Sequence, residues 1–304
     1  MRYGVPVALL AAALVAGGCS DDKPTPPPAE AASQTPDPAY DASLEPSAAV
    51  LALVPETAQT LTVTDFDQVR LELGLPDVAG DSDPAEVQGL WDRAVAERPL
   101  LTPGMLRPVD QRLRTRYGVS QVDVAWEAHF FDDAGQEVGW VLAFRDGTDM
   151  QAVQRAVGDG AGALAGASAD AELRLVSSGT TADPTQSWAG DEETAAMVGL
   201  PANATYVSRA CTQSPAGESA AADVDELETW SVQFEGSLVT ARLGEGRHDL
   251  FARLRLGEAD PTFAAAYDGG VADPRTGRIG YVMADPAGAA RLALSERLPF
   301  AACP

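Results

Sequence analysis

Basic residues are scarce in this 304-residue chain. It holds 21 lysines and arginines against 45 aspartates and glutamates, which gives a formal net charge of −24 at pH 7. Lys23 is the only lysine. A surface of this sign repels both nucleic-acid phosphates and anionic lipid headgroups. The composition therefore predicts no nucleic-acid partner and no direct adsorption to an anionic membrane.

Long apolar runs and familiar catalytic or metal-binding motifs are missing as well. The longest apolar run has about ten residues, whereas a membrane-spanning helix needs roughly 20. The sequence contains no Gly-x-Ser-x-Gly, HExxH, CxxC or P-loop motif. We therefore predict no metal, no cofactor and no assignable catalytic residue. Whether the protein is an enzyme stays open, and a non-catalytic role is favoured.

The first twenty residues have the layout of a secretory signal. Arg2 precedes the apolar run, and small residues lead to Cys19. The stretch Val15–Cys19 resembles the lipobox of bacterial lipoproteins, although Ala16 stands where leucine is commonest. The resemblance implies cleavage after residue 18, a diacylglycerol on the sulfur of Cys19 and an acyl chain such as palmitate on its new N-terminus. The alternative is an ordinary signal peptide with an incidental cysteine.

Residues 19–45 are expected to form a lipidated cysteine followed by a tether. Prolines occur at positions 24, 26, 27, 28, 36 and 38 among alanine, serine, threonine and acidic residues. This stretch has no apolar period from which a core could form. A proline-rich chain extends by about 3.1 Å per residue, so the tether could reach roughly 60–70 Å from the membrane.

Cysteine is rare, with three in the chain. If Cys19 carries lipid, Cys211 and Cys303 remain as an even pair in an exported protein, which predicts a disulfide. Loop closure over so long a segment is assigned roughly 4–5 kcal/mol in the chain-entropy account. The alternative is two free thiols.

The rest of the chain, about 260 residues, is long enough for one large domain or two small ones. Alternating patterns predict strands at Leu61–Thr64, Val122–Phe130 and Trp230–Glu235. Helix signals lie between them, such as the Asp83 cap, a Thr148 cap and the Asp285 cap, each before an apolar stripe. The expected fold class is α+β, with antiparallel sheets and helices packed on one face.

Two pairs of similar segments suggest a pseudo-repeat within the sequence. Pro55 and Pro201 each lead into a strand, and Gly139–Ala143 resembles Gly280–Ala284 at nearly the same offset. The expected organisation is an α+β first half over residues 46–195 and an α+β second half over residues 196–304. Whether these halves are separate domains or one continuous fold stays open.

The histidines are weak catalytic candidates. His129 shares the polar face of its predicted strand with Glu127, so a general base or a metal ligand is conceivable. A solvated surface residue is the favoured interpretation because no second ligand is placed nearby. His248, beside Asp249 at a predicted helix start, is interpreted in the same way.

One basic patch occurs in this acidic chain. Guanidinium groups at suitable spacing can hold a phosphate or an anionic headgroup. Pairing with the abundant carboxylates is the favoured alternative. The candidate anion-binding residues are Arg107, Arg112, Arg114 and Arg116.

Three functions are compatible with these features. The first is a membrane-anchored, extracytoplasmic lipoprotein that binds an envelope protein or another envelope component. The second is a carrier that holds a lipid or other apolar ligand between sheet and helices. The third is a hydrolase with an unrecognised site that includes His129 and Glu127. Membrane contact through the lipid anchor and location on the outer face of the cell membrane are expected whichever of these functions the chain has.

The lipid anchor predicts the behaviour of one variant. Cys19→Ala removes the only sulfur that the lipobox offers for lipid attachment, so the variant should leave the membrane fraction. Cell fractionation of wild type and variant measures this. Retention of the variant in membranes would mean that another anchor holds the protein.

Overall fold

The computed structural model describes residues 39–213 and 223–304. The predicted signal peptide, Cys19 and nearly all of the tether lie outside these residues. Within the described ranges, no helix combines the length and apolar character needed to cross a membrane.

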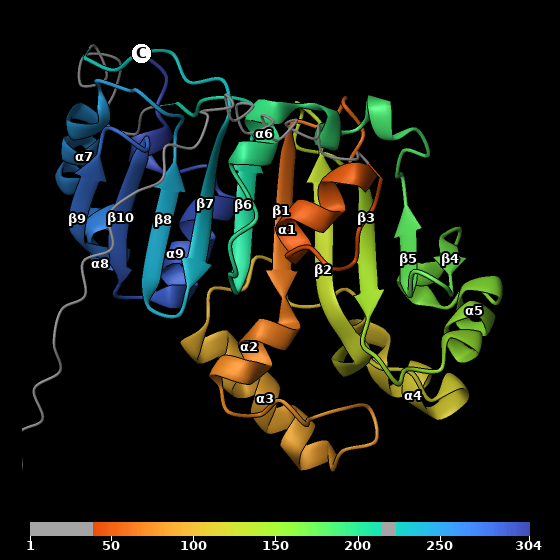
Figure 1. Cartoon of the computed structure of the whole chain (residues 1–304). Coiled ribbons are helices and arrows are strands. Elements are labelled where there is room, and N and C mark those ends of the chain that lie inside the picture. Colours follow the sequence, from red (N-terminus) through yellow and green to blue (C-terminus); the bar gives the residue numbers. More distant parts are fainter. Residues whose placement is uncertain (1–38, 214–222) are drawn as a thin grey trace, which may run out of the picture. The chain divides into compact units, whose positions relative to one another are not determined.

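The described chain is built on one antiparallel sheet of ten strands, in the order β4-β5-β3-β2-β1-β6-β7-β8-β10-β9 (Figure 1). The predicted α+β class is confirmed. The strands are β1 (Thr60–Asp65), β2 (Val124–Phe131), β3 (Glu137–Phe144), β4 (Ser168–Asp170), β5 (Leu175–Ser178), β6 (Ala204–Ser208), β7 (Trp230–Glu235), β8 (Leu238–Arg242), β9 (Tyr267–Asp273) and β10 (Arg278–Met283).

The strand order is symmetric about the centre of the sheet. Strands β1 and β6 pair antiparallel there, with Thr62 opposite Tyr206. Outward from this pair, β2, β3, β5 and β4 on one side correspond to β7, β8, β10 and β9 on the other. Each half thus adds a hairpin next to its central strand and a second hairpin at the edge. The two halves form one continuous sheet.

The strand order agrees with only one of the two pairs of similar sequence segments. The stretches after Pro55 and Pro201 enter β1 and β6, which do occupy corresponding places. The other pairing is wrong, because Gly139–Ala143 lies in β3 and Gly280–Ala284 begins in β10, whereas the counterpart of β3 is β8. Short apolar alternation is common to inner strands, so it cannot identify one of them.

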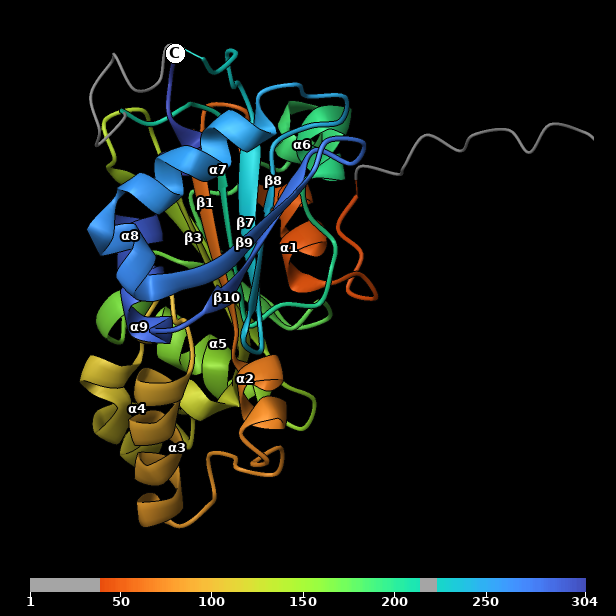
Figure 2. The ribbon, with the colours of Figure 1, turned by 90° about the vertical axis from the view of Figure 1, so that its left-hand side faces the viewer.

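Helices cover the two faces unequally (Figure 2). Helices α7, α8 and α9 lie against the face that carries Tyr206, here called the helical face, while α1 and α6 lie on the opposite, back face. The helices are α1 (Pro46–Ala49), α2 (Phe66–Glu72), α3 (Pro84–Glu97), α4 (Asp110–Tyr117), α5 (Met150–Gly158), α6 (Glu192–Ala196), α7 (Leu250–Ala259), α8 (Pro261–Ala266) and α9 (Pro286–Leu294).

Capping explains most helix starts. The Asp83 side chain accepts from the backbone N–H of Ala85, and Asp285 accepts from that of Gly288, so both predicted caps are confirmed. The predicted Thr148 cap is wrong, since Asp149 accepts from the first-turn N–H groups of α5. A carboxylate one residue later offers the stronger, charged acceptor.

The predicted disulfide between Cys211 and Cys303 is present. Backbone bonds reinforce it: Thr212 donates to the carbonyl of Ala301 at 2.8 Å, and Cys303 donates to the carbonyl of Thr212 at 2.8 Å. The C-terminal residues are therefore held against the segment that follows β6.

A buried arginine fastens the same C-terminal segment to α7. Arg253 is fully buried, and its Nε lies 2.7 Å from Oδ2 of Asp249 one turn earlier. Burial raises the pKa of Asp249, but hydrogen bonds from Arg247 and the charge of Arg253 outweigh it and lower the pKa to about 2. The remaining N–H groups of Arg253 donate to the carbonyls of Phe300, Ala302 and Asp225.

This network predicts a large difference between two arginines of one helix. Arg253→Met leaves the buried carbonyls of Phe300 and Ala302 without this donor and the buried Asp249 without its charged partner, so it should lower the free energy of unfolding by about 3–5 kcal/mol. Arg255→Met on the exposed side of α7 should change it by less than about 0.5 kcal/mol. Urea unfolding without reductant measures both values, and equal losses would contradict a structural role for Arg253.

Candidate functional site

Glu127 lies in the middle of β2 on the helical face, opposite Thr64 of β1 and Leu142 of β3. It is fully buried, so the prediction that this side of the strand faces solvent is wrong. The chain between β1 and β2 folds back over the strand and covers it. Alternation along β2 correctly places Glu127 and His129 on one face, but it cannot show what packs on that face.

Four groups donate hydrogen bonds to the Glu127 carboxylate. The Thr102 hydroxyl lies at 2.5 Å from Oε1, and the backbone N–H of Met105 lies at 3.1 Å from both oxygens. The Gln121 side-chain amide lies at 3.1 Å from Oε2, and Nε2 of His129 at 2.7 Å from Oε1. These hydrogen bonds supply the stabilisation that a buried carboxylate needs. Glu127 thereby ties the covering segments to the sheet.

His129 bridges two carboxylates. Its Nε2 meets Glu127, and its Nδ1 meets Glu137 at the start of β3. Because both ring nitrogens face carboxylate oxygens, both donate and the ring is an imidazolium. Burial lowers its pKa, but the hydrogen bonds that the ring donates to Glu127 and Glu137 outweigh burial and raise the pKa to about 9.

The histidine is therefore not the solvated surface residue that was predicted, since its side chain is only 14% exposed. A general base needs a neutral ring with a free nitrogen, and His129 has neither. The nearby Thr102 hydroxyl donates to Glu127 and not to the histidine, so Thr102 and His129 do not form a nucleophile–base pair. His248 is exposed just before α7.

Two of the candidate arginines share a pocket of about 470 Å³ between α3 and α4. The guanidinium of Arg107 lies 4.7 Å from the ring centroid of Trp91, in cation–π geometry. Arg114 lies on the same side of α4, where its Nη2 is 3.5 Å from Oδ2 of Asp110. The pocket thus combines two positive charges with one negative charge.

The other candidate arginines point elsewhere. Arg112 and Arg116 are one turn apart on the side of α4 away from the pocket, and both are exposed. Arg116 pairs with Asp159 at 2.8 Å. The helical period of α4 thus divides the patch, so these arginines do not form one anion site.

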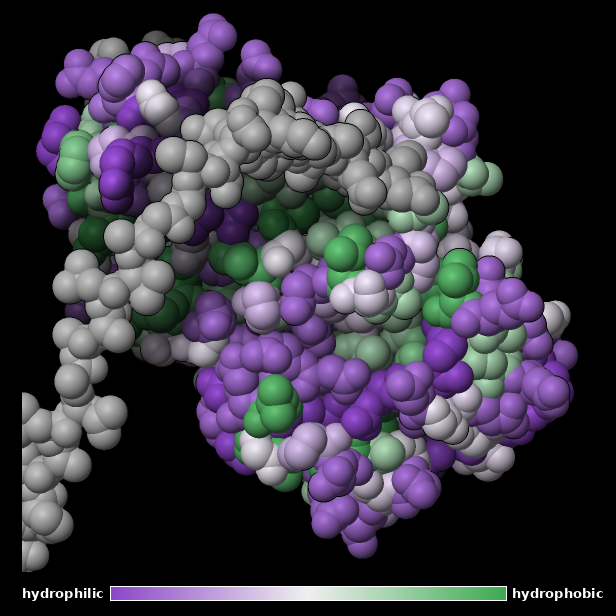
Figure 3. All heavy atoms as spheres, viewed as in Figure 1, coloured by the Kyte–Doolittle hydropathy of each residue, from purple (hydrophilic) through white to green (hydrophobic). Residues whose placement is uncertain are grey.

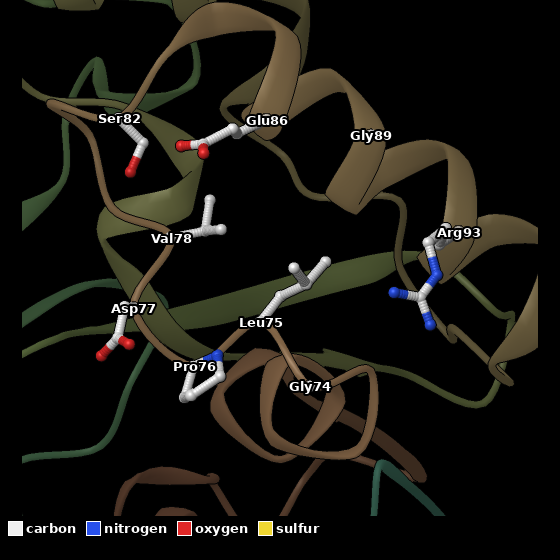
Figure 4. Close-up of a pocket in the computed structure, with 9 residues that line it drawn as sticks. All are labelled: Gly74, Leu75, Pro76, Asp77, Val78, Ser82, Glu86, Gly89 and Arg93. Carbon is white, nitrogen blue, oxygen red and sulfur yellow. The ribbon is translucent and has the colours of Figure 1, made fainter.

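A further pocket of about 410 Å³ adjoins α3 and was not predicted (Figure 4). Leu75 and Val78 extend into it from the loop after α2, whereas Glu86 and Arg93 border it from α3. Gly89 lies between the last two on α3, and its missing side chain leaves space. Arg93 is already paired with Glu97 at 3.0 Å, and the carboxylates of Asp77 and Glu86 also line the pocket, so its charge is mainly negative.

Comparisons with protein-family models, with curated proteins and with solved structures each find no match to this chain. Its function is therefore inferred from the chemistry of its own side chains. In the most chemically distinctive group, Glu127–His129–Glu137, hydrogen bonds occupy both ring nitrogens of His129 and the buried carboxylate of Glu127. Its partners Thr102 and Gln121 are distant in sequence and carry no motif.

The raised pKa of His129 predicts a pH-dependent stability. Since the unfolded value is near 6.5, the stabilisation is fully present below about pH 6.5 and is lost as the pH rises through about 9. His129→Gln should lower the free energy of unfolding by up to about 3 kcal/mol at pH 6, and the difference from wild type should shrink by pH 10.

Urea unfolding at several pH values measures this difference. His248→Gln is the matched control, because His248 is exposed. The control should follow wild type at each pH. A constant gap between His129→Gln and wild type from pH 6 to pH 10 would argue against a charged histidine.

Proposed function

We propose that this chain is a membrane-anchored, extracytoplasmic lipoprotein whose folded part binds a partner and does not catalyse a reaction. The observation that carries this proposal is the state of His129. Its two nitrogens are bonded to Glu127 and Glu137, and Glu127 has three further donors. The hydrolase alternative required this pair to be available for substrate, whereas its hydrogen bonds are used within the fold.

The extracytoplasmic location is supported by two independent features. The N-terminal segment resembles a lipobox ending in Cys19, and a proline-rich stretch follows it. Cys211 and Cys303 form a disulfide in the folded part. Disulfides persist in exported proteins and are rare in the reducing cytosol. Both features fit a domain held outside the membrane on a tether.

The carrier alternative calls for an enclosed apolar cavity between the halves. The described residues do form an apolar groove between α3 of the first half and α9 of the second, lined by Leu100, Ala290 and Leu294. Its volume is about 210 Å³. Ligand pockets typically measure about 300–1,000 Å³, so this groove is small for a lipid. This groove between the halves therefore gives little support to lipid transport.

Binding without catalysis predicts a specific capture result. The full chain, solubilised from its own membranes with mild detergent, should retain a defined protein partner in near-stoichiometric amount. His129→Gln, studied at a pH where it stays folded, should retain the same partner, because His129 acts on the fold. Affinity capture followed by native mass spectrometry measures both.

Two outcomes would contradict the proposal. A bound lipid in addition to the Cys19 anchor, with no protein partner, would support the carrier alternative. Repeated recovery of the chain alone, from membranes in which it is expressed, would count against a binding role.

A further inference from the structure

The two halves differ in how their back faces are covered. In the first half, Trp126, Phe130 and Val141 pack against Val50 and Trp188 from segments outside the sheet. In the second half, the corresponding cover is α6, which is only five residues long. The segment around α6 reaches β7 and β8 at one end, where Ser231 and Arg242 donate to the carbonyls of Met197 and Ala196.

Beyond α6, the back face of β8, β10 and β9 stays exposed. The strand register places Leu238 opposite Val282, and Val271 opposite Gly280, all on this face. These side chains are largely exposed: Leu238 to 54%, Val282 to 44% and Val271 to 68%. Figure 3 shows apolar surface among charged residues over this part of the sheet. We call the surface formed by Leu238, Thr240, Arg242, Val271, Arg278 and Val282 the open sheet face.

The open sheet face carries two arginines directly opposite each other. Arg242 of β8 faces Arg278 of β10. Among the described residues, neither has a carboxylate within ion-pair distance. Like charges in this position destabilise a sheet. In a chain with 45 acidic residues, these two arginines are thus neighbours on one face without an ion-pair partner among the described residues.

The residues around these two arginines also give them no ion-pair partner. Burial, and then the charge of Arg278, lower the pKa of Arg242. Asp273 lies opposite Arg278 in the register, but its oxygens face Arg275 and the Thr276 hydroxyl. On the other side, Gln233 of β7 is buried, and neither its amide nitrogen nor its oxygen has a partner among the described residues.

We infer that the open sheet face docks a segment of a partner protein in which a carboxylate is flanked by aliphatic side chains. The carboxylate would bind the exposed Arg278, supported by the field of Arg242, and the aliphatic groups would pack on Leu238, Val271 and Val282. This inference rests on the proposed binding function and adds the surface and the chemistry of the partner.

The charges around the face favour a protein segment over a membrane surface. Glu235 and Asp268 are exposed beside it, and Asp273 is partly exposed. An anionic bilayer would be repelled by these carboxylates together with the net charge of −24. A narrow segment with a single carboxylate can reach the arginine pair between them.

A site-specific photo-crosslinker tests the inference in the full, lipidated chain in its own membrane. With p-benzoylphenylalanine in place of Val282, illumination should give an adduct to one protein. Its cross-linked peptide, sequenced by mass spectrometry, should contain aspartate or glutamate among aliphatic residues. Adding Arg278→Glu should lower the adduct yield at least about tenfold. Arg255→Glu, an exposed arginine on α7, is the matched control and should leave the yield unchanged.

Stability provides a second measurement on the purified chain. Arg278→Gln removes the like charge opposite Arg242 and, unlike Arg278→Glu, sets no carboxylate opposite Asp273, so this variant should melt about 1–3 °C above wild type while its adduct yield falls. Changing the partner's acidic residue to arginine should restore the adduct to Arg278→Glu. A lower melting temperature, or an adduct that ignores the charge at position 278, would overturn the inference.

The remaining outcomes separate this inference from the proposed function. An adduct to lipid or to a second copy of the chain at position 282 would overturn the assigned partner chemistry. A protein adduct from a crosslinker at the exposed Phe251 on α7, with none at position 282, would leave the binding function standing and reject this face. Adducts at neither position, in cells that make the captured partner, would count against both.

Discussion

The antiparallel pairing of β1 with β6 is the contact on which the rest of the structure depends. Its register runs from Thr60 opposite Ser208 to Thr64 opposite Ala204, and every other strand is added outward from it. An antiparallel central pair relates its flanking strands by a local two-fold axis. The two halves therefore share one sheet and one helical face, and neither half has an inner edge to protect from aggregation.

The junction between the halves is polar on the helical face, and this explains the buried ion network. Thr60, Thr62 and Thr64 of β1 are all buried on that side. The segment that joins β1 to β2 covers them, and its backbone N–H groups at Leu101 and Thr102 donate to the Thr64 hydroxyl. Glu127 accepts the next donors along the same segment. Apolar side chains at this place in the sheet would leave these donors without acceptors. Glu127 and His129 therefore have a structural role in holding the covering segment.

Local features were predictable from the sequence, whereas contacts between distant segments were not. The β1 strand, the Asp83 cap and the Cys211–Cys303 pair follow from alternation, capping chemistry and cysteine number. The burial of Glu127 was missed because Thr102 and Gln121 reach it through tertiary folding. The arginine patch was divided for a simpler reason: at about 3.6 residues per turn, Arg112 and Arg114, two residues apart, lie on different sides of α4.

The two halves have the same strand order, but their back faces are covered by different kinds of side chain. Because the order is the same, both halves need cover for the same positions. The first half meets this need with apolar side chains such as Phe130 under Val50 and Trp188. The second half places Gln233, Thr240 and Arg242 at its back face. Apolar side chains packed there would leave these polar groups buried without hydrogen-bond partners. Its residues suit a polar, negatively charged contact, which is why the exposed valines and Leu238 border two arginines and not a closed core.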